Sequence, residues 1–309
     1  MTEEIKKPDD DKVNLSDEDK KDLIEEFNKR GYLLEDRMIE VLDSIENHYG
    51  ILKGEIGMEY GRRNNNERVE IDAMLFTNQK LFLFDAKRTE YDWIFAPSLH
   101  KAVNTINLIC HHPKRKFISL PMKVRENSPI RIVHHDFVVG FEGANLGKKN
   151  DKKSLALPKE KFRPIHDGVR QILKETKAVL LEGRKYLKND AMFLIPVIVT
   201  NARLLYIDYK KEQIDSKGNL TDFNSMSEIP AVGYNFHESL GFNTEQGLSS
   251  SKPENIVKTI VIININHLKE MIEYFSKQYL WIDFKTDEKF FTIPDESDYH
   301  ETKKFWDSD

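Results

Sequence analysis

Residues 69–88 have the sequence VEIDAMLFTNQKLFLFDAKR, in which two apolar runs flank the polar segment TNQK. Runs rich in β-branched and aromatic residues on either side of a short polar segment are typical of a β-hairpin. If Thr77 lies opposite Lys80, antiparallel pairing keeps the sum of partner numbers constant, so Asp72 lies opposite Asp85. A two-residue loop and a four-residue loop give this same register, whereas a three-residue loop separates the aspartates onto opposite faces. The stretch therefore predicts a hairpin that brings two carboxylates together.

The end of the hairpin also carries a lysine. Asp85 and Lys87 lie on the same face of a strand, about 6–7 Å apart, and Ala86 points the other way. Two opposed carboxylates destabilise an ordinary sheet, and strands rich in Leu and Phe tolerate unpaired charges poorly. A divalent cation would resolve this conflict, because carboxylate and main-chain carbonyl oxygens are ligands that Mg²⁺ accepts. We therefore expect a cation site at this hairpin.

A simpler interpretation of the same residues stays open. The run DAKR can face solvent at a strand end, and Glu70 lies opposite Lys87 in this register, where the two would form a cross-strand ion pair. A short motif of this kind also arises by chance.

The pattern resembles the PD-(D/E)xK phosphodiesterase superfamily, which has the restriction-endonuclease-like fold. Asp72 matches the first acidic position and residues 85–87 match the Asp-x-Lys trio, with Ile71 in place of Pro and Asp in place of the more usual Glu. The resemblance implies a mixed α/β sheet flanked by helices in the order α, β, β, β, α, β, onto which residues 32 to about 140 can be laid.

The resemblance also implies an activity. A relative of this kind would be a metal-dependent nuclease that hydrolyses phosphodiester bonds, with DNA more expected than RNA. Asp72, Asp85 and the main-chain carbonyl of Ala86 would hold Mg²⁺ or Mn²⁺, and Lys87 would orient or polarise the attacking water. The alternative from another class is a catalytically silent nuclease fold that binds nucleic acid or a protein partner. A third interpretation is an unrelated mixed α/β protein in which DAKR is coincidental.

The helix expected before the hairpin supplies the remaining acid that the resemblance implies. Four acidic residues compete for this position: Glu35, Asp36, Glu40 and Glu46. Glu35 lies three and seven residues before Met38 and Leu42, at the margin of the apolar helix stripe. Glu40 shares its face with Arg37 and Ser44, which indicates solvated surface. We therefore expect Glu35 to be a catalytic residue and metal ligand, with Glu40 in reserve.

Periodicity outlines the rest of the chain. Residues 1–15 are predicted to be a disordered charged tail, and 16–309 a single nuclease domain with its motif-bearing core at about 32–140 and an elaboration at about 141–309. We expect helices over 97–112, 165–187 and 267–279 and strands over 131–141, 193–201, 203–209 and 258–266. Pro196 should stand at a strand start, an edge or a bulge. The predicted fold class is a restriction-endonuclease-like α/β sheet extended by C-terminal strands and helices.

Composition limits the partners. The formal net charge of −5 gives no global attraction to polyanions, so nucleic acid would require a local basic surface. The single cysteine, Cys110, excludes an internal disulfide framework and favours a reducing, cytoplasmic compartment. No signal peptide or membrane span is expected. A homodimer stays open, and the histidine pairs at 111–112 and 134–135 do not suggest zinc.

Aromatic residues follow the trio. Arg88, Tyr91, Trp93 and Phe95 could stack on nucleotides, although core packing is the commoner role for such aromatics. Basic runs at 111–116 and 148–153 could contact phosphates, with solvated loops as the default.

Overall fold

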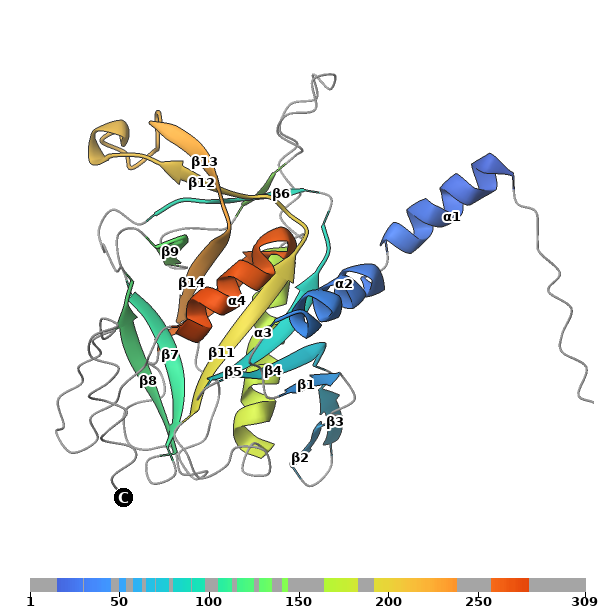
Figure 1. Cartoon of the computed structure of the whole chain (residues 1–309). Helices are drawn as coiled ribbons and strands as arrows, with labels where there is room; N and C mark the ends of the chain where they lie inside the picture. The colour runs from blue at the N-terminus through green and yellow to red at the C-terminus, as the bar shows by residue number, and fades with distance from the viewer. Residues whose placement is uncertain are drawn as a thin grey trace, which may run out of the picture.

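A mixed sheet of nine strands forms the centre of the protein (Figure 1). The structure is a computed structural model, and it describes residues 16–29, 31–45, 50–53, 58–62, 65–69, 71–77, 80–89, 91–97, 105–112, 116–124, 128–134, 141–143, 164–182, 192–237 and 257–277. The predicted tail at 1–15 lies outside these ranges. The described residues form an α/β protein with four α-helices, which agrees with the predicted α/β class.

The sheet order is β1-β4-β5-β11-β15-β14-β9, and β7 joins β11 and β8. Its strands are β1 (Gly50–Lys53), β4 (Ala73–Thr77), β5 (Lys80–Lys87), β7 (Thr105–His112), β8 (Lys116–Lys123), β9 (Ile130–His134), β11 (Met192–Thr200), β14 (Ala231–His237) and β15 (Val257–Asn264). A four-stranded sheet holds β10 (Phe141–Gly143), β6 (Asp92–Phe95), β12 (Leu204–Asp208) and β13 (Ser225–Ile229), and β2 (Met58–Arg62) pairs with β3 (Asn65–Val69). The helices are α1 (Asp17–Lys29), α2 (Tyr32–Asp43), α3 (Pro164–Glu182) and α4 (Leu268–Lys277), with short 3₁₀ turns at Lys211–Gln213 and Ile265–His267.

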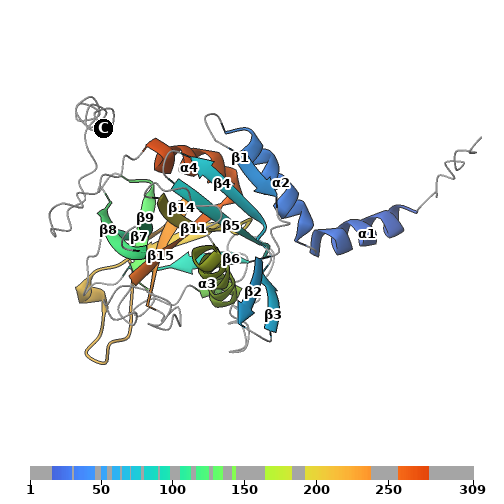
Figure 2. The same ribbon diagram turned by 90° about the horizontal axis from the view of Figure 1, so that it is seen from below.

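Helices cover both faces of the main sheet. Figure 2 shows α2 and α4 on one side and α3 on the other. In β5, Leu81 and Leu83 pack into the core cluster that contains the α3 residues, whereas Phe82 and Phe84 pack with α2 and α4. This alternation follows from the two-residue period of a strand. It fixes which side chains of β5 share a face with α3.

The hairpin register is as predicted. β4 pairs antiparallel with β5 from Thr77↔Lys80 to Ala73↔Phe84. Asp72 directly precedes Ala73, the first paired residue of β4. Continuing the register by one residue places Asp72 opposite Asp85. The pairing therefore places the two aspartates at the same end of the hairpin.

The helix expected over 97–112 is wrong where the structure describes it. Residues Thr105–His112 form β7, which pairs with β8 over its whole length and with β11 at Met192–Leu194. Ile106 and Leu108 pack in the α2/α4 cluster and Ile109 in the α3 cluster, which is a strand period. A short apolar run fits either element, and pairing with neighbouring strands decides in favour of the strand.

Pro196 lies in the middle of β11, so the expected strand start, edge or bulge is wrong. On one edge β11 runs parallel to β5. On its other edge, Met192–Leu194 pair with β7 and Val197–Thr200 pair with β15. Pro196 falls between these two partners, where the loss of a main-chain N–H interrupts neither of the two pairings. The changeover of partner explains how an inner strand accepts proline.

The first helix follows its sequence signals. The Asp19 amide donates to Ser16 Oγ at 3.1 Å, so Ser16 caps α1. Leu23, Ile24 and Phe27 of α1 are exposed. Within the described ranges, no helix is both long and apolar enough to cross a lipid bilayer.

Candidate active site

Asp72 is fixed by the backbone of the opposite strand. The amide of Ala86 donates to Asp72 Oδ2 at 2.7 Å. Because the N–H and C=O of one strand residue point to the same side, the Ala86 carbonyl also faces the β4 side of β5. Pairing with β4 ends at Ala73↔Phe84, so the Ala86 carbonyl lies beyond the last paired residue of β4. The expected ligand carbonyl and Asp72 therefore belong to one end of the hairpin.

Asp85 and Lys87 contact each other on the α3 face. Lys87 Nζ lies 2.8 Å from Asp85 Oδ1, which confirms that the two residues share a face. The same Nζ donates to Gln171 Oε1 of α3 at 2.8 Å. The competing partner Glu70 lies outside the described residues. Lys87 is therefore held between a strand carboxylate and a helix amide.

The environment of Asp85 disfavours its ionised form. The side chain is fully buried, and among the described residues its Oδ2 has no hydrogen-bond partner. Burial raises the pKa of Asp85 from 3.8 to about 7, with Lys87 opposing the rise and the charges of Asp72 and Glu35 adding to it. A carboxyl group in this position gains from any additional positive charge.

A buried acid from α3 joins this group, and the sequence reasoning missed it. Glu175 is 0% exposed. Burial raises its pKa from 4.5 to about 9, and the charges of Asp85 and Asp72 contribute next. The Gln171 amide and Lys87 lower this pKa, although no hydrogen bond of ordinary geometry to either carboxylate oxygen forms among the described residues.

A signal for Glu175 was present in the sequence. Glu175 lies three residues after Ile172 and four before Val179, both of which are buried apolar residues of the same helix. An acidic residue inside an apolar helix stripe is unusual. The resemblance places the helical acid before the hairpin, whereas Glu175 lies on the helix after it.

Glu35 and Glu40 occupy different surroundings on α2. Glu35 is partly buried, and its negative charge contributes to raising the pKa of Asp85. Glu40 is exposed and forms an ion pair with Arg37 at 2.6 Å, as expected for a residue on the solvated face. The buried stripe of α2 packs on the sheet face opposite to α3. Glu35 thus acts on Asp85 electrostatically, whereas Glu175 shares its sheet face.

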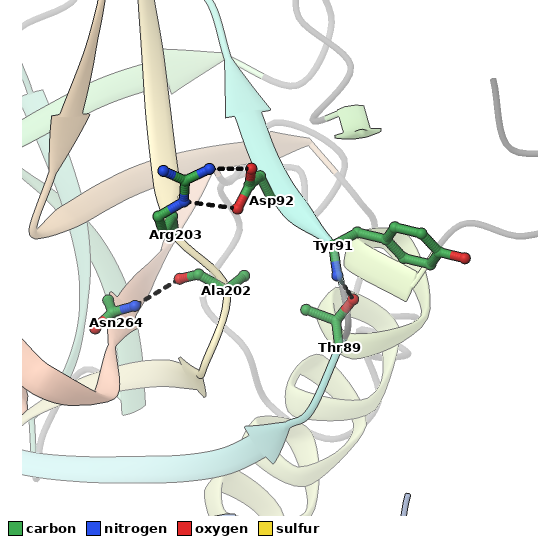
Figure 3. A network of polar contacts seen from close by, with 6 residues as sticks. All are labelled: Thr89, Tyr91, Asp92, Ala202, Arg203 and Asn264. Atoms are coloured by element: carbon green, nitrogen blue, oxygen red, sulfur yellow. Dashed lines mark hydrogen bonds and ion pairs between the residues drawn. The ribbon is translucent and has the colours of Figure 1, made fainter. Parts of the chain in front are cut away.

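The segment after β5 is anchored to the end of β11. Figure 3 shows Tyr91 N donating to Thr89 Oγ1, and Arg203 forming two bonds to Asp92, at 3.0 Å and 2.6 Å. Asn264 Nδ2 donates to the Ala202 carbonyl in the same region. These contacts hold the chain as it leaves the candidate site.

Of the aromatic candidates, Trp93 and Phe95 are fully buried core residues, so the stacking interpretation is wrong for them. Arg88 and Tyr91 are exposed. Residues 113–115, 135–136 and 148–153, from the basic runs and the second histidine pair, lie outside the described ranges.

The donor chemistry of the site fits Mg²⁺ or Mn²⁺, but its present arrangement is not a finished ligand shell. Asp85 Oδ2 and both Glu175 oxygens are buried without a partner among the described residues, and all are hard oxygen donors. Within the same ranges, however, no three His, Cys, Asp or Glu side chains are arranged so that they could hold a metal ion. Binding would require the carboxylates to turn toward one point.

No protein-family model, no curated protein and no solved structure matches this chain in the three comparisons made.

Proposed function

We propose that this chain is a metal-dependent nuclease that hydrolyses phosphodiester bonds, with DNA as the expected substrate. The observation that carries the proposal is the pair of contacts at one end of the hairpin: Lys87 Nζ with Asp85 Oδ1, and Ala86 N with Asp72 Oδ2. A purely structural hairpin has little use for two aspartates beside a buried strand end.

The order of elements supports the same proposal. α2, β1, β4, β5, α3 and β11 follow one another with insertions, and β1, β4, β5 and β11 are neighbours in the sheet. This is the order α, β, β, β, α, β that the resemblance implies, but its placement over residues 32 to about 140 is wrong, because the helix and the last strand lie at 164–182 and 192–200. The elements around the hairpin thus come from both sides of residue 140.

The residues at the end of the hairpin would have different roles in hydrolysis. When bound, Mg²⁺ or Mn²⁺ supplies Lewis acidity that activates water and neutralises charge on the phosphate. Asp72, Asp85 and the Ala86 carbonyl are the oxygens that would hold it. Lys87 would orient or polarise the attacking water, as the resemblance implies. The ion pair with Asp85 and the bond to Gln171 keep Lys87 at the reacting end of β5.

One observation favours the second candidate, a catalytically silent nucleic-acid-binding module. Lys87 already neutralises part of Asp85, and no complete set of metal ligands stands ready among the described residues. A silent module would retain this closed arrangement in the presence of cations.

Cleavage assays separate the two candidates. Purified chain is incubated with single-stranded, duplex and branched DNA and with RNA, in Mg²⁺, in Mn²⁺ and in EDTA. We expect cleavage that EDTA abolishes and that the substitution Asp85→Asn removes. Glu40→Gln is the matched control, because Glu40 is exposed and bonded to Arg37. Absence of cleavage on every substrate with both metals would favour the silent module.

A further inference from the structure

Glu175 is a buried carboxyl group to which no cationic side chain is bonded among the described residues, although the Gln171 amide lies near enough to lower its pKa. Its side chain is 0% exposed and neither oxygen takes part in a hydrogen bond there. The helix residues on either side of it along the stripe, Ile172 and Val179, are apolar and buried. Leaving such a group unsatisfied costs about 1–3 kcal/mol or more, and among the described residues no cationic side chain is bonded to Glu175 to offset this cost.

The face of α3 that carries Glu175 lies over the end of β5. A Cβ atom on Gly168 would meet Lys87 Cγ at 3.2 Å, and Gln171 Oε1 bonds Lys87 Nζ. Gly168, Gln171 and Glu175 are spaced by three and four residues, which places them on one helix face. The charges of Asp85 and Asp72 act on Glu175. Glu175 therefore lies close to the two aspartates, on the sheet face of Asp85.

We propose that Glu175 is a third carboxylate ligand of the cation held by Asp72 and Asp85, an inference that rests on the proposed metal-dependent function. Glu175 comes from α3, after the hairpin, whereas the expected helical acid Glu35 comes from α2, before the hairpin. Oxygen donors that are buried and unpartnered suit a hard divalent cation.

Other partners fit Glu175 less well. Lys87 Nζ donates to Asp85 and to Gln171 at 2.8 Å each, and it makes no hydrogen bond to the Glu175 carboxylate.

The arrangement also shows how a closed site can open. Ligation requires Lys87 to release Asp85 Oδ1, and the bond from Lys87 to Gln171 provides an alternative position that keeps the ammonium hydrogen-bonded. When ionised, three carboxylates and one lysine carry a net charge of −2 (−3 and +1), which a divalent cation neutralises.

Mn²⁺ binding without nucleic acid tests the proposal independently of cleavage. Free Mn²⁺ is measured by electron paramagnetic resonance during titration of the full chain at pH 8. We expect Glu175→Gln to raise the Kd for Mn²⁺ by about ten- to hundredfold, because the loss of a metal-site partner commonly weakens metal binding to this extent. Asp85→Asn should weaken it similarly. Thr176→Val is the matched control, since Thr176 is buried on the same helix and donates to the Ile172 carbonyl at 2.6 Å. It should bind Mn²⁺ as the parent does.

The outcomes separate this inference from the proposed function. If the parent binds Mn²⁺ and loses it in Asp85→Asn but not in Glu175→Gln, Glu175 is not a ligand and the aspartate site stands. If the parent binds no Mn²⁺, the metal-dependent function fails, and the inference with it. Should Glu175→Gln not fold, as judged by near-ultraviolet circular dichroism, Glu175→Asp takes its place. That change keeps the charge but withdraws the oxygens by one methylene, so unchanged affinity would overturn the role of Glu175.

Discussion

The main-chain N–H of Ala86 donates a hydrogen bond to Oδ2 of Asp72 at 2.7 Å. Through this bond the backbone of β5 orients the side chain that precedes β4. The two strands of the hairpin are thus connected beyond the last pair of their ladder, at the end where the candidate site lies.

This contact lets two substitutions of Asp72 separate folding from chemistry. Asp72→Asn keeps an oxygen acceptor for the Ala86 amide, so stability should stay close to that of the parent while cleavage falls about 100-fold or more. Asp72→Ala removes the acceptor and should also cost about 1–3 kcal/mol of unfolding free energy. Urea unfolding and cleavage rates measure the two effects. Equal stability of both variants would show that the bond to Ala86 contributes little.

The buried acids predict how stability depends on pH when no metal is bound. The folded protein raises the pKa of Asp85 from 3.8 to about 7 and that of Glu175 from 4.5 to about 9. Between these limits the folded state binds more protons than the unfolded state, so stability falls as pH rises. The contribution of these two carboxyl groups to the free energy of unfolding is fully present below about pH 4, and it is lost as the pH rises through 7 to 9. Melting temperatures in EDTA should show this fall in the parent and a smaller one in Glu175→Gln. Identical pH profiles would mean that Glu175 is not held in a desolvated position.

The two glutamates of α2 offer a matched pair. Glu35→Gln should reduce cleavage by about tenfold or more, because the Glu35 charge acts on Asp85 and the residue is partly buried. Glu40→Gln should leave cleavage within about twofold, since its exposed ion pair with Arg37 contributes little. Initial rates on the same substrate compare them. The reverse order would show that the helical face was assigned wrongly.

Gly168 tests how closely α3 must approach the lysine. Alanine favours a helix interior by about 1 kcal/mol over glycine, but its Cβ would lie 3.2 Å from Lys87 Cγ and 3.4 Å from Ile198 Cδ1. We expect Gly168→Ala to fold, to melt within a few degrees of the parent, and to lose cleavage by about tenfold because Lys87 shifts. Parallel thermal melts and cleavage rates check this. Full activity would show that Lys87 has room to adjust.

Local sequence signals predicted the hairpin well. A strand period, a polar loop and opposed apolar residues together fix the register from Thr77↔Lys80 onward. The shared face of Asp85 and Lys87 follows from the same period. These features depend on residues that are neighbours in the chain, so the sequence could predict them, and the observed pair Thr77↔Lys80 excludes the three-residue loop.

Features that depend on distant residues were harder to predict. The strand at Thr105–His112 looks helical in isolation and becomes a strand because β8 and β11 supply partners. Glu175 joins the site only because α3 packs on the face of β5 that carries Asp85. A short window of sequence contains no signal for the pairing of β7. For Glu175 the one local signal is its position inside the apolar stripe of α3.

The polar cluster combines local contacts of the hairpin with one contact to the distant helix α3. The bond between Lys87 and Gln171 joins residues separated by 84 positions, and β11 follows α3 along the chain. Closing so long a loop costs entropy before the contact repays it, and such non-local contacts slow folding. A nascent chain that ends before residue 164 has neither α3 nor β11, so its hairpin lacks the neighbour that covers one edge of β5. Gln171 and Glu175 therefore join Asp85 and Lys87 only after α3 has been synthesised and has packed on the sheet.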